Sequence, residues 1–165
     1  MLIKLEKFGK KHLDRSRGWM NDKELCRLFN RHFKFLTVAK QKDWYKNLLK
    51  DKTQLIFAII VDGVYVGNVG LKNIDKENKK AEYYIFIGDT NYRGKGIGLE
   101  GTIKLLDYAK KSLKLHKIYL HVDATNFSAI RLYSKIGFKK EGLLCDELFL
   151  NGKFVSMFRM AFFLK

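Results

Sequence analysis

The stretch Asn91-Tyr92-Arg93-Gly94-Lys95-Gly96-Ile97-Gly98-Leu99-Glu100 joins an apolar run to a long amphipathic segment. The run before it, residues 83–88, is aromatic and β-branched, which is typical of a strand. After it, apolar residues recur at near-helical spacing between Ile97 and Leu113. The sequence therefore predicts a strand, a glycine-rich turn and a helix, in that order.

This turn is suited to binding an anion. Glycines let the backbone approach a ligand closely, and the first N–H groups of a helix point outward, where the helix dipole favours negative charge. Arg93 and Lys95 add positive charge at the same place. The spacing matches neither the nucleoside-triphosphate motif G-x-x-x-x-G-K-[ST] nor the dinucleotide motif G-x-G-x-x-G. A flexible connection that binds nothing is the alternative.

A second informative segment, residues 126–138, reads as a short helix. Asn126 is a suitable N-cap, and Gly137 is a suitable terminator. Asn126 and Tyr133 are about two helical turns apart, so we expect them to lie on one face.

The two segments together resemble the GNAT superfamily of N-acetyltransferases. In that family the motif Q/R-x-x-G-x-G/A binds the pyrophosphate of acetyl-coenzyme A, and a later motif N-x-x-A-x-x-x-Y-x-x-x-G-F follows it. The first motif is filled here by Arg93, Gly96 and Gly98, and the second by Asn126, Ala129, Tyr133, Gly137 and Phe138. The tail, residues 141–160, resembles one branch: the nucleotide-sugar, spermidine and ribosomal-protein N-acetyltransferases.

The resemblance implies a single α/β domain over residues 1–165. We expect a mixed, mostly antiparallel sheet of about seven strands, with splayed central strands and about four flanking helices. The dipeptide Asp62-Gly63 indicates a hairpin turn. The expected strands cover residues 3–8, 55–61, 64–71, 82–87, 117–122, 138–145 and 154–162, and the expected helices cover residues 21–33, 42–49, 96–113 and 126–136.

Acetyl transfer to an amine requires a neutral nucleophile, a stabilised oxyanion and a proton for the departing thiolate. Tyr133 is the expected general acid; without the motif it would read as a core tyrosine. Glu82 is the expected base, acting directly or through water, with an exposed strand carboxylate as the alternative. The resemblance places acetyl-coenzyme A, the co-substrate, against Phe86, Ile87, Arg93, Gly94, Lys95, Gly96, Ile97, Gly98, Asn126, Ala129 and Tyr133.

On the acceptor side, Trp19-Met20-Asn21-Asp22 resembles a W-x-N-D segment of the same branch. Trp19, Asn21 and His32 are therefore the acceptor candidates. A half-buried Trp19 that anchors a helix is the alternative.

The chain carries 33 Lys and Arg against 17 Asp and Glu, a formal charge of +16. A positive field attracts anions and repels polyamines. We therefore expect the acceptor to be the amino group of a nucleotide-linked amino sugar, a precursor of surface glycans. A polyamine such as spermidine, a protein N-terminus, or a non-catalytic acyl-coenzyme A-binding module are the alternatives.

The remaining expectations concern surroundings and partners. The two cysteines lie far apart, and neither they nor the four scattered histidines show metal-ligand spacing, so we expect no metal. The lysines are dispersed, so nucleic-acid binding is not expected. The longest apolar run, residues 55–61, is too short to span a membrane, and a cytoplasmic location follows. A homodimer through residues 154–162 is left open.

Overall fold

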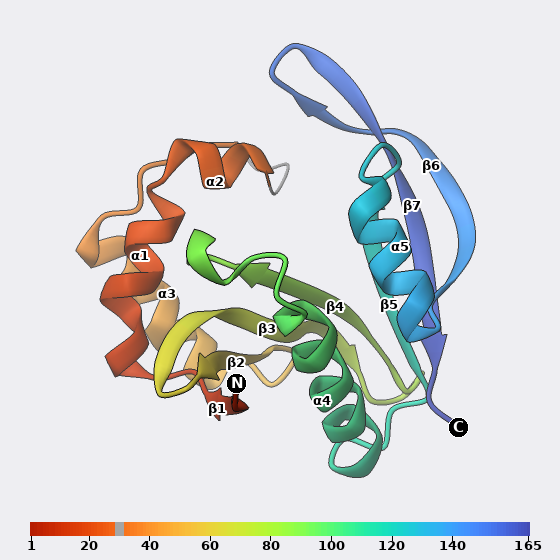
Figure 1. The fold of residues 1–165 in the computed structure, drawn as a ribbon, viewed down its shortest axis with the longest axis horizontal. Coiled ribbons are helices and arrows are strands. Elements are labelled where there is room, and N and C mark those ends of the chain that lie inside the picture. The colour runs from red at the N-terminus through yellow and green to blue at the C-terminus, as the bar shows by residue number, and fades with distance from the viewer. Residues whose placement is uncertain (29–31) are drawn as a thin grey trace.

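The computed structural model describes residues 1–28 and 32–165. One sheet of seven strands has the order β1-β2-β3-β4-β5-β7-β6 (Figure 1). All neighbouring strands pair antiparallel except β4 and β5, which are parallel. The strands are β1 Ile3–Lys7, β2 Leu55–Val61, β3 Val64–Asp75, β4 Lys80–Ile87, β5 Lys117–Asp123, β6 Lys139–Leu150 and β7 Lys153–Phe163. The mixed, mostly antiparallel sheet predicted from the sequence is confirmed.

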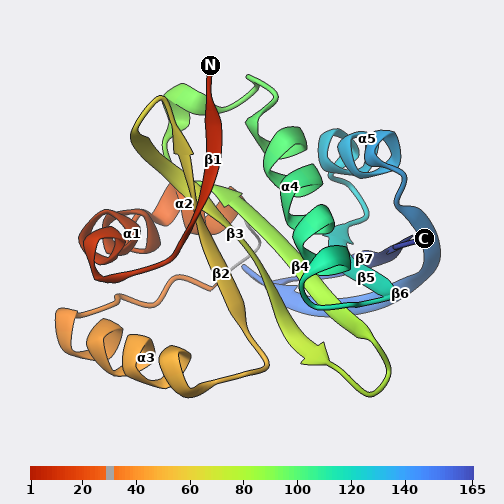
Figure 2. The ribbon, with the colours of Figure 1, turned by 90° about the horizontal axis from the view of Figure 1, so that it is seen from below.

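Helices cover both faces of this sheet. Helices α4 and α5 lie on one face, whereas α1 and α3 lie on the other (Figure 2). The helices are α1 Leu13–Met20, α2 Lys23–Leu28, α3 Val38–Lys50, α4 Ile97–Lys111 and α5 Phe127–Ile136, with 3-10 turns at Lys10–His12 and Thr90–Tyr92.

The main core lies between the sheet and α4 with α5. Leu71, Leu105, Ile118 and Met160 are completely buried there. A smaller cluster on the opposite face contains Phe8, Ile56, Ala58, Ile60 and Tyr65, with side chains of α1 and α3 packed against it. Strand residues alternate between these two apolar layers.

Local signals explain several element boundaries. Asp62 and Gly63 both have positive φ, 47° and 84°, as a two-residue hairpin turn between β2 and β3 requires. The Thr37 side chain accepts a hydrogen bond from Lys40 N and begins α3, four residues before the expected start. Asn126 and Gly137 cap the two ends of α5 as predicted.

The expected single helix over residues 21–33 is wrong. The chain forms α1 before it and the short α2 within it, and they are separated at Asn21 and Asp22. Asn21 bonds the backbone of Leu36 through both ends of its amide, and Asp22 accepts from Leu25 N at the start of α2. These side-chain bonds replace the continuous helix. Residues 29–31 of the expected range lie outside the described residues.

Candidate active site

The central strands separate, as predicted. Strands β4 and β5 pair only at Lys80–Glu82 with Lys117–Tyr119. Beyond Glu82, β4 continues to Ile87 alongside β3, and β5 continues to Asp123 alongside β7. The sheet therefore opens between residues 83–87 and residues 120–123.

The glycine-rich turn that follows β4 has the geometry expected of an anion cradle. Gly94 and Gly96 have φ of +72° and +78°, conformations that L side chains rarely adopt, and a Cβ at either would meet no atom within 4 Å. The Glu100 N–H bonds Gly96 O, so the N–H groups of residues 97–99 precede the hydrogen-bonded part of α4. The Ile97 side chain is buried in the core, and only its backbone can face a ligand. This geometry suits a pyrophosphate.

Arg93 joins the cradle to the end of β4. Its guanidinium donates from Nε and Nη2 to the Ile87 carbonyl oxygen, at 3.1 and 2.9 Å. Lys95 is exposed, with its Nζ 5.7 Å from the centre of the Tyr92 ring. Arg93 therefore both adds charge at the turn and holds the backbone carbonyl of Ile87.

Tyr133 lies on the α4 and α5 side of the opening. Its ring contacts Tyr83 and Phe138, with centroids 6.0 and 5.8 Å away. Burial raises the pKa of Tyr133 to about 12, so the phenol is protonated at neutral pH and able to donate. Within the described residues, no hydrogen bond engages its hydroxyl.

The residues behind Tyr133 are joined by hydrogen bonds. Tyr83 forms a 2.6 Å hydrogen bond with the Thr102 hydroxyl, and Thr102 donates to Gly98 O at 2.6 Å. The hydroxyl of Tyr83, whose ring contacts Tyr133, is thus linked through Thr102 to Gly98 in the first turn of α4. Asn126 begins the same helix as Tyr133: its side chain accepts from Ala129 N at 3.0 Å, so the N-cap function is present.

Glu82 lies on the opposite face of the sheet, at the last β4–β5 pair. Its carboxylate accepts from Lys72 Nζ at 3.0 Å, Asn73 Nδ2 at 2.9 Å and His121 Nδ1 at 3.2 Å. Burial acts to raise the pKa of Glu82, but the hydrogen bonds and charges of Lys72 and His121 outweigh it and hold this pKa below its usual value. Glu82 is therefore a carboxylate with strong partners.

The acceptor candidates do not form one group. Trp19 contacts Phe86 and Tyr65, with centroids 5.6 and 4.8 Å away, so Trp19 borders the β4 side of the opening. Phe86 points to this face rather than toward Tyr133. The amide of Asn21 is engaged by Leu36. His32 is exposed beside residues 29–31, and no contact in the described residues joins it to Trp19 or Glu82.

His121 was not singled out by sequence reasoning. It lies on β5, two residues beyond Tyr119, and its ring is 5.8 Å from Tyr119. Strand alternation places Tyr119 and His121 on one face, which is a readable signal. The approach of Glu82 depends on the parallel pairing of β4 with β5, and no local motif predicts that pairing.

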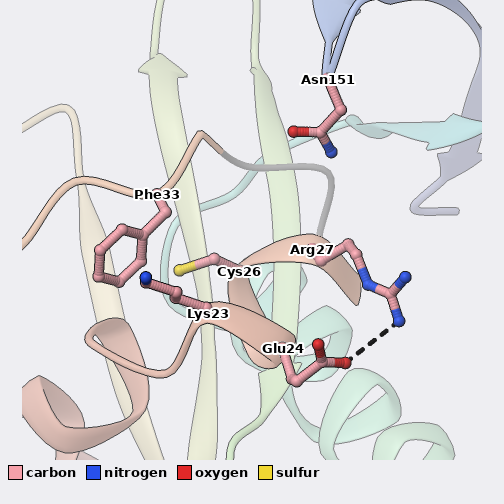
Figure 3. Close-up of a pocket in the computed structure, with 6 residues that line it drawn as sticks. All are labelled: Lys23, Glu24, Cys26, Arg27, Phe33 and Asn151. Atoms are coloured by element: carbon pink, nitrogen blue, oxygen red, sulfur yellow. Dashed lines mark hydrogen bonds and ion pairs between the residues drawn. The ribbon is translucent and has the colours of Figure 1, made fainter.

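A pocket of about 280 Å³ lies elsewhere, between α2 and the β6–β7 turn (Figure 3). It is lined by Lys23, Glu24, Cys26, Arg27, Phe33 and Asn151. Glu24 is paired with Arg27 at 3.1 Å, as the dashed line shows. The pocket contains neither Tyr133 nor Glu82, so it is separate from the candidate active site.

Metal-ion clusters and membrane-spanning helices are both absent from the described residues. Residues 1–28 and 32–165 contain no group of three His, Cys, Asp or Glu placed to hold a metal ion. In the same residues, no helix has the length and apolar character needed to cross a membrane.

The site combines a glycine-rich turn suited to an anion, an opening between β4 and β5, and Tyr133 beside that opening. These features are those expected of an acyl-coenzyme A-dependent transferase. Comparison with known proteins supports this class. A model of the acetyltransferase (GNAT) domain matches residues 3–139. The chain belongs to the GNAT family of acetyltransferases.

Particular relatives narrow the class. The chain is 36% identical to spermidine N(1)-acetyltransferase of Escherichia coli (strain K12) over 121 residues, which are 73% of this chain and 64% of that relative. The chain thus spans less than two thirds of that curated relative. The crystal structure of spermidine N-acetyltransferase from Vibrio cholerae with CoA and spermine has a TM-score of 0.92 and 27% identity, covering 98% of this chain and 95% of that chain. A dodecameric structure of the Vibrio enzyme has a TM-score of 0.85 and 27% identity, with 98% and 93% covered.

These relatives overturn the expected acceptor. The sequence favoured a nucleotide-linked amino sugar because of the +16 charge, whereas the relatives are spermidine N-acetyltransferases. The charge argument is wrong because it summed the whole surface. Exposed charges more than about 10 Å away are largely screened in salt, so dispersed lysines do not set the field at one site.

Proposed function

We propose that this chain is an acetyl-coenzyme A-dependent N-acetyltransferase whose acceptor is a polyamine of the spermidine class. The observation that carries the proposal is the opening between β4 and β5, with the anion cradle and Tyr133 beside it. The similarity over 98% of the chain to an enzyme solved with CoA and spermine supports both the donor and the acceptor.

In this account the donor lies on the α4 and α5 side. The N–H groups at the start of α4, with Gly94, Gly96 and Gly98, hold the pyrophosphate, and Lys95 adds charge. The pantetheine arm passes Asn126 and Ala129 into the opening. The backbone at Ile87, fixed by Arg93, meets the carbonyl oxygen of the thioester.

The amine attacks the thioester carbon, the carbon–sulfur bond breaks, and Tyr133 gives its proton to the leaving thiolate. Because burial raises the pKa of Tyr133 to about 12, the proton is present throughout the neutral range. A phenol less acidic than a thiol stabilises the thiolate mainly through a hydrogen bond and transfers its proton late.

The acceptor approaches from the opposite face, where the partly buried Trp19 ring lies against Phe86 near the end of β4. Aromatic faces attract alkylammonium groups by cation–π interaction. The neighbouring acids Asp22 and Glu24 are unsuited to binding a polyamine. Asp22 caps α2 and Glu24 is paired with Arg27. Polyamine binding in this account depends on the aromatic side chain of Trp19 close to the opening.

We further propose that the chain self-associates in the cytoplasm, where acetyl-coenzyme A is available. The Vibrio enzyme forms a dodecamer. In this chain the β6–β7 hairpin exposes Phe149 and Phe154, whose rings are 4.9 Å apart. Exposed aromatic pairs of this kind are typical of contact surfaces.

The test is product analysis by mass spectrometry after incubation with acetyl-coenzyme A. Spermidine, a nucleotide-linked amino sugar and a ribosomal-protein N-terminal peptide serve as parallel acceptors. We expect acetylated spermidine. Turnover of the peptide alone would replace the polyamine proposal, and binding of acetyl-coenzyme A without any product would favour the non-catalytic module.

A further inference from the structure

The hydrogen-bonded pair of Glu82 and His121 lies where β4 and β5 separate. Glu82 pairs with Tyr119 at the last β4–β5 position, and His121 is two residues further along β5, at the start of the opening. Both side chains lie on the face opposite Tyr133, because Glu82 precedes Tyr83, whose ring contacts Tyr133. The pair therefore faces the side from which the acceptor approaches.

The bond between them fixes how the imidazole carries its proton. His121 Nδ1 is 3.2 Å from Glu82 Oε1. A carboxylate only accepts hydrogen bonds, so Nδ1 must carry the hydrogen. Neutral His121 then has its lone pair on Nε2, and the ring remains partly exposed, at 27% for the side chain. Nε2 is a proton acceptor directed away from Glu82.

Glu82 itself is poorly placed to take a proton. Its Oε1 accepts from both Lys72 and His121, and its Oε2 accepts from Asn73. Protonating it would disrupt interactions with all three donors. Glu82 is suited to orienting His121 and to stabilising the imidazolium once formed.

The charged groups near His121 come from four other strands, with Glu82 on β4 and Glu141 on β6. Lys72 is on β3, and Arg159 on β7 is directly opposite His121 in the strand register. Arg159 is paired with Glu141, and its guanidinium lies over the Tyr119 ring at 4.3 Å. Among the described residues, Glu82 is the only one of these charged groups that is hydrogen-bonded to the His121 ring.

We propose that His121 Nε2 accepts the proton of the acceptor ammonium group, directly or through one water, and that Glu82 is its positioning residue. This inference rests on the proposed acetyltransferase function. The ammonium loses one proton to Nε2, and the free amine attacks the thioester carbonyl. Attack gives a tetrahedral intermediate, and the carbon–sulfur bond then breaks with its electron pair going to sulfur, which receives the Tyr133 proton. The nitrogen gives its second proton to water, Tyr133 is reprotonated from solvent, and the imidazolium returns its proton to solvent.

Kinetics across pH test the proposal. His121→Gln should lower kcat for spermidine about 100-fold near pH 7, as loss of a general base does. The deficit should shrink as the pH approaches the amine's own pKa of about 10, because free amine needs no base. His116→Gln, on the exposed loop before β5, is the matched control and should match wild type. Unchanged turnover of His121→Gln, or a deficit constant across pH, would overturn the proposal.

A measurement on the unmutated protein covers the case in which the variant does not fold. Long-range 1H–15N NMR of the histidine rings reports which nitrogen carries hydrogen. We expect neutral His121 as the Nδ1–H tautomer in wild type; Nε2–H would overturn the proposal. Failure of the proposed acetyltransferase function would give a different result. Wild type would then acetylate no amine, even with His121 in the expected tautomer, and the base role of His121 would be excluded as well.

Discussion

Glu82 and Tyr83 are adjacent on β4, and their side chains serve opposite faces of the sheet. Tyr83 contacts Tyr133 on the α4 and α5 side, whereas Glu82 bonds His121 on the other side. The two faces of the sheet are connected through the opening where β4 and β5 have separated. In the proposed mechanism, proton donation to the thiolate and proton removal from the amine therefore take place on opposite faces of the sheet, so the two groups do not neutralise each other.

The cradle depends on backbone conformation at Gly96. Gly96→Ala places a Cβ at φ +78°, which costs roughly 1 kcal/mol of strain even though no atom lies within 4 Å. We expect a lower melting temperature and weaker acetyl-coenzyme A binding by calorimetry. Gly142→Ala, which has open space and no positive φ, is the control. Equal affinity in the two variants would show that the turn does not hold the donor.

Trp19 is expected to act as an anchor over the end of β4. A Cβ at Gly88 would lie 2.1 Å from the Trp19 ring, so Gly88→Ala should destabilise the fold strongly. Trp19→Ala should itself cost about 3 kcal/mol. In the double variant the added Cβ has room, and the two costs should not add. Strict additivity in urea unfolding would mean that the ring does not occupy this place.

Asn21 is expected to support the fold and not to bind the acceptor. Asn21→Ala removes both bonds to the Leu36 backbone and should lower the free energy of unfolding by about 1–3 kcal/mol. KM for spermidine should stay as in Asn47→Ala, an exposed control on α3. A raised KM with unchanged stability would instead assign Asn21 to the acceptor site.

The lowered pKa of Glu82 makes stability depend on pH. Because folding favours its charged form, its stabilising contribution is complete above the unfolded value of 4.5 and is lost as pH falls through the folded pKa. Urea unfolding at neutral and acidic pH should therefore show a smaller acid loss in Glu82→Gln than in wild type. Glu77→Gln, in an exposed turn, should retain the full loss. If all three proteins lost the same unfolding free energy on acidification, the stabilising interactions of Glu82 with its observed partners would be contradicted.

Features encoded locally were predictable from the sequence. The cradle, the caps of α5 and the β2–β3 turn each depend on glycine or capping residues within a few positions. Helix α1 was missed because its sequence is mostly polar and includes Gly18; contacts such as Trp19 with Tyr65 hold it against the sheet. These contacts are tertiary and leave no periodic pattern.

The acceptor side was less predictable for a related reason. Glu82 and His121 are 39 positions apart and meet only through the parallel register of β4 and β5. The total charge of the chain was a misleading guide to the acceptor, because it does not describe this local arrangement of side chains. The assignment of Glu82 as the base stays a prediction of the sequence, in competition with the His121 proposal.

The central claim is tested most directly by kcat and kcat/KM for spermidine in wild type and Tyr133→Phe, with acetyl-coenzyme A affinity measured in parallel. Phenylalanine keeps the ring contacts with Tyr83 and Phe138 and removes only the proton donor. We predict efficient wild-type acetylation of spermidine, a loss of about 100-fold or more in the variant, and unchanged donor binding. Equal turnover by the two proteins, or a wild type that binds acetyl-coenzyme A but does not acetylate spermidine, would contradict the account.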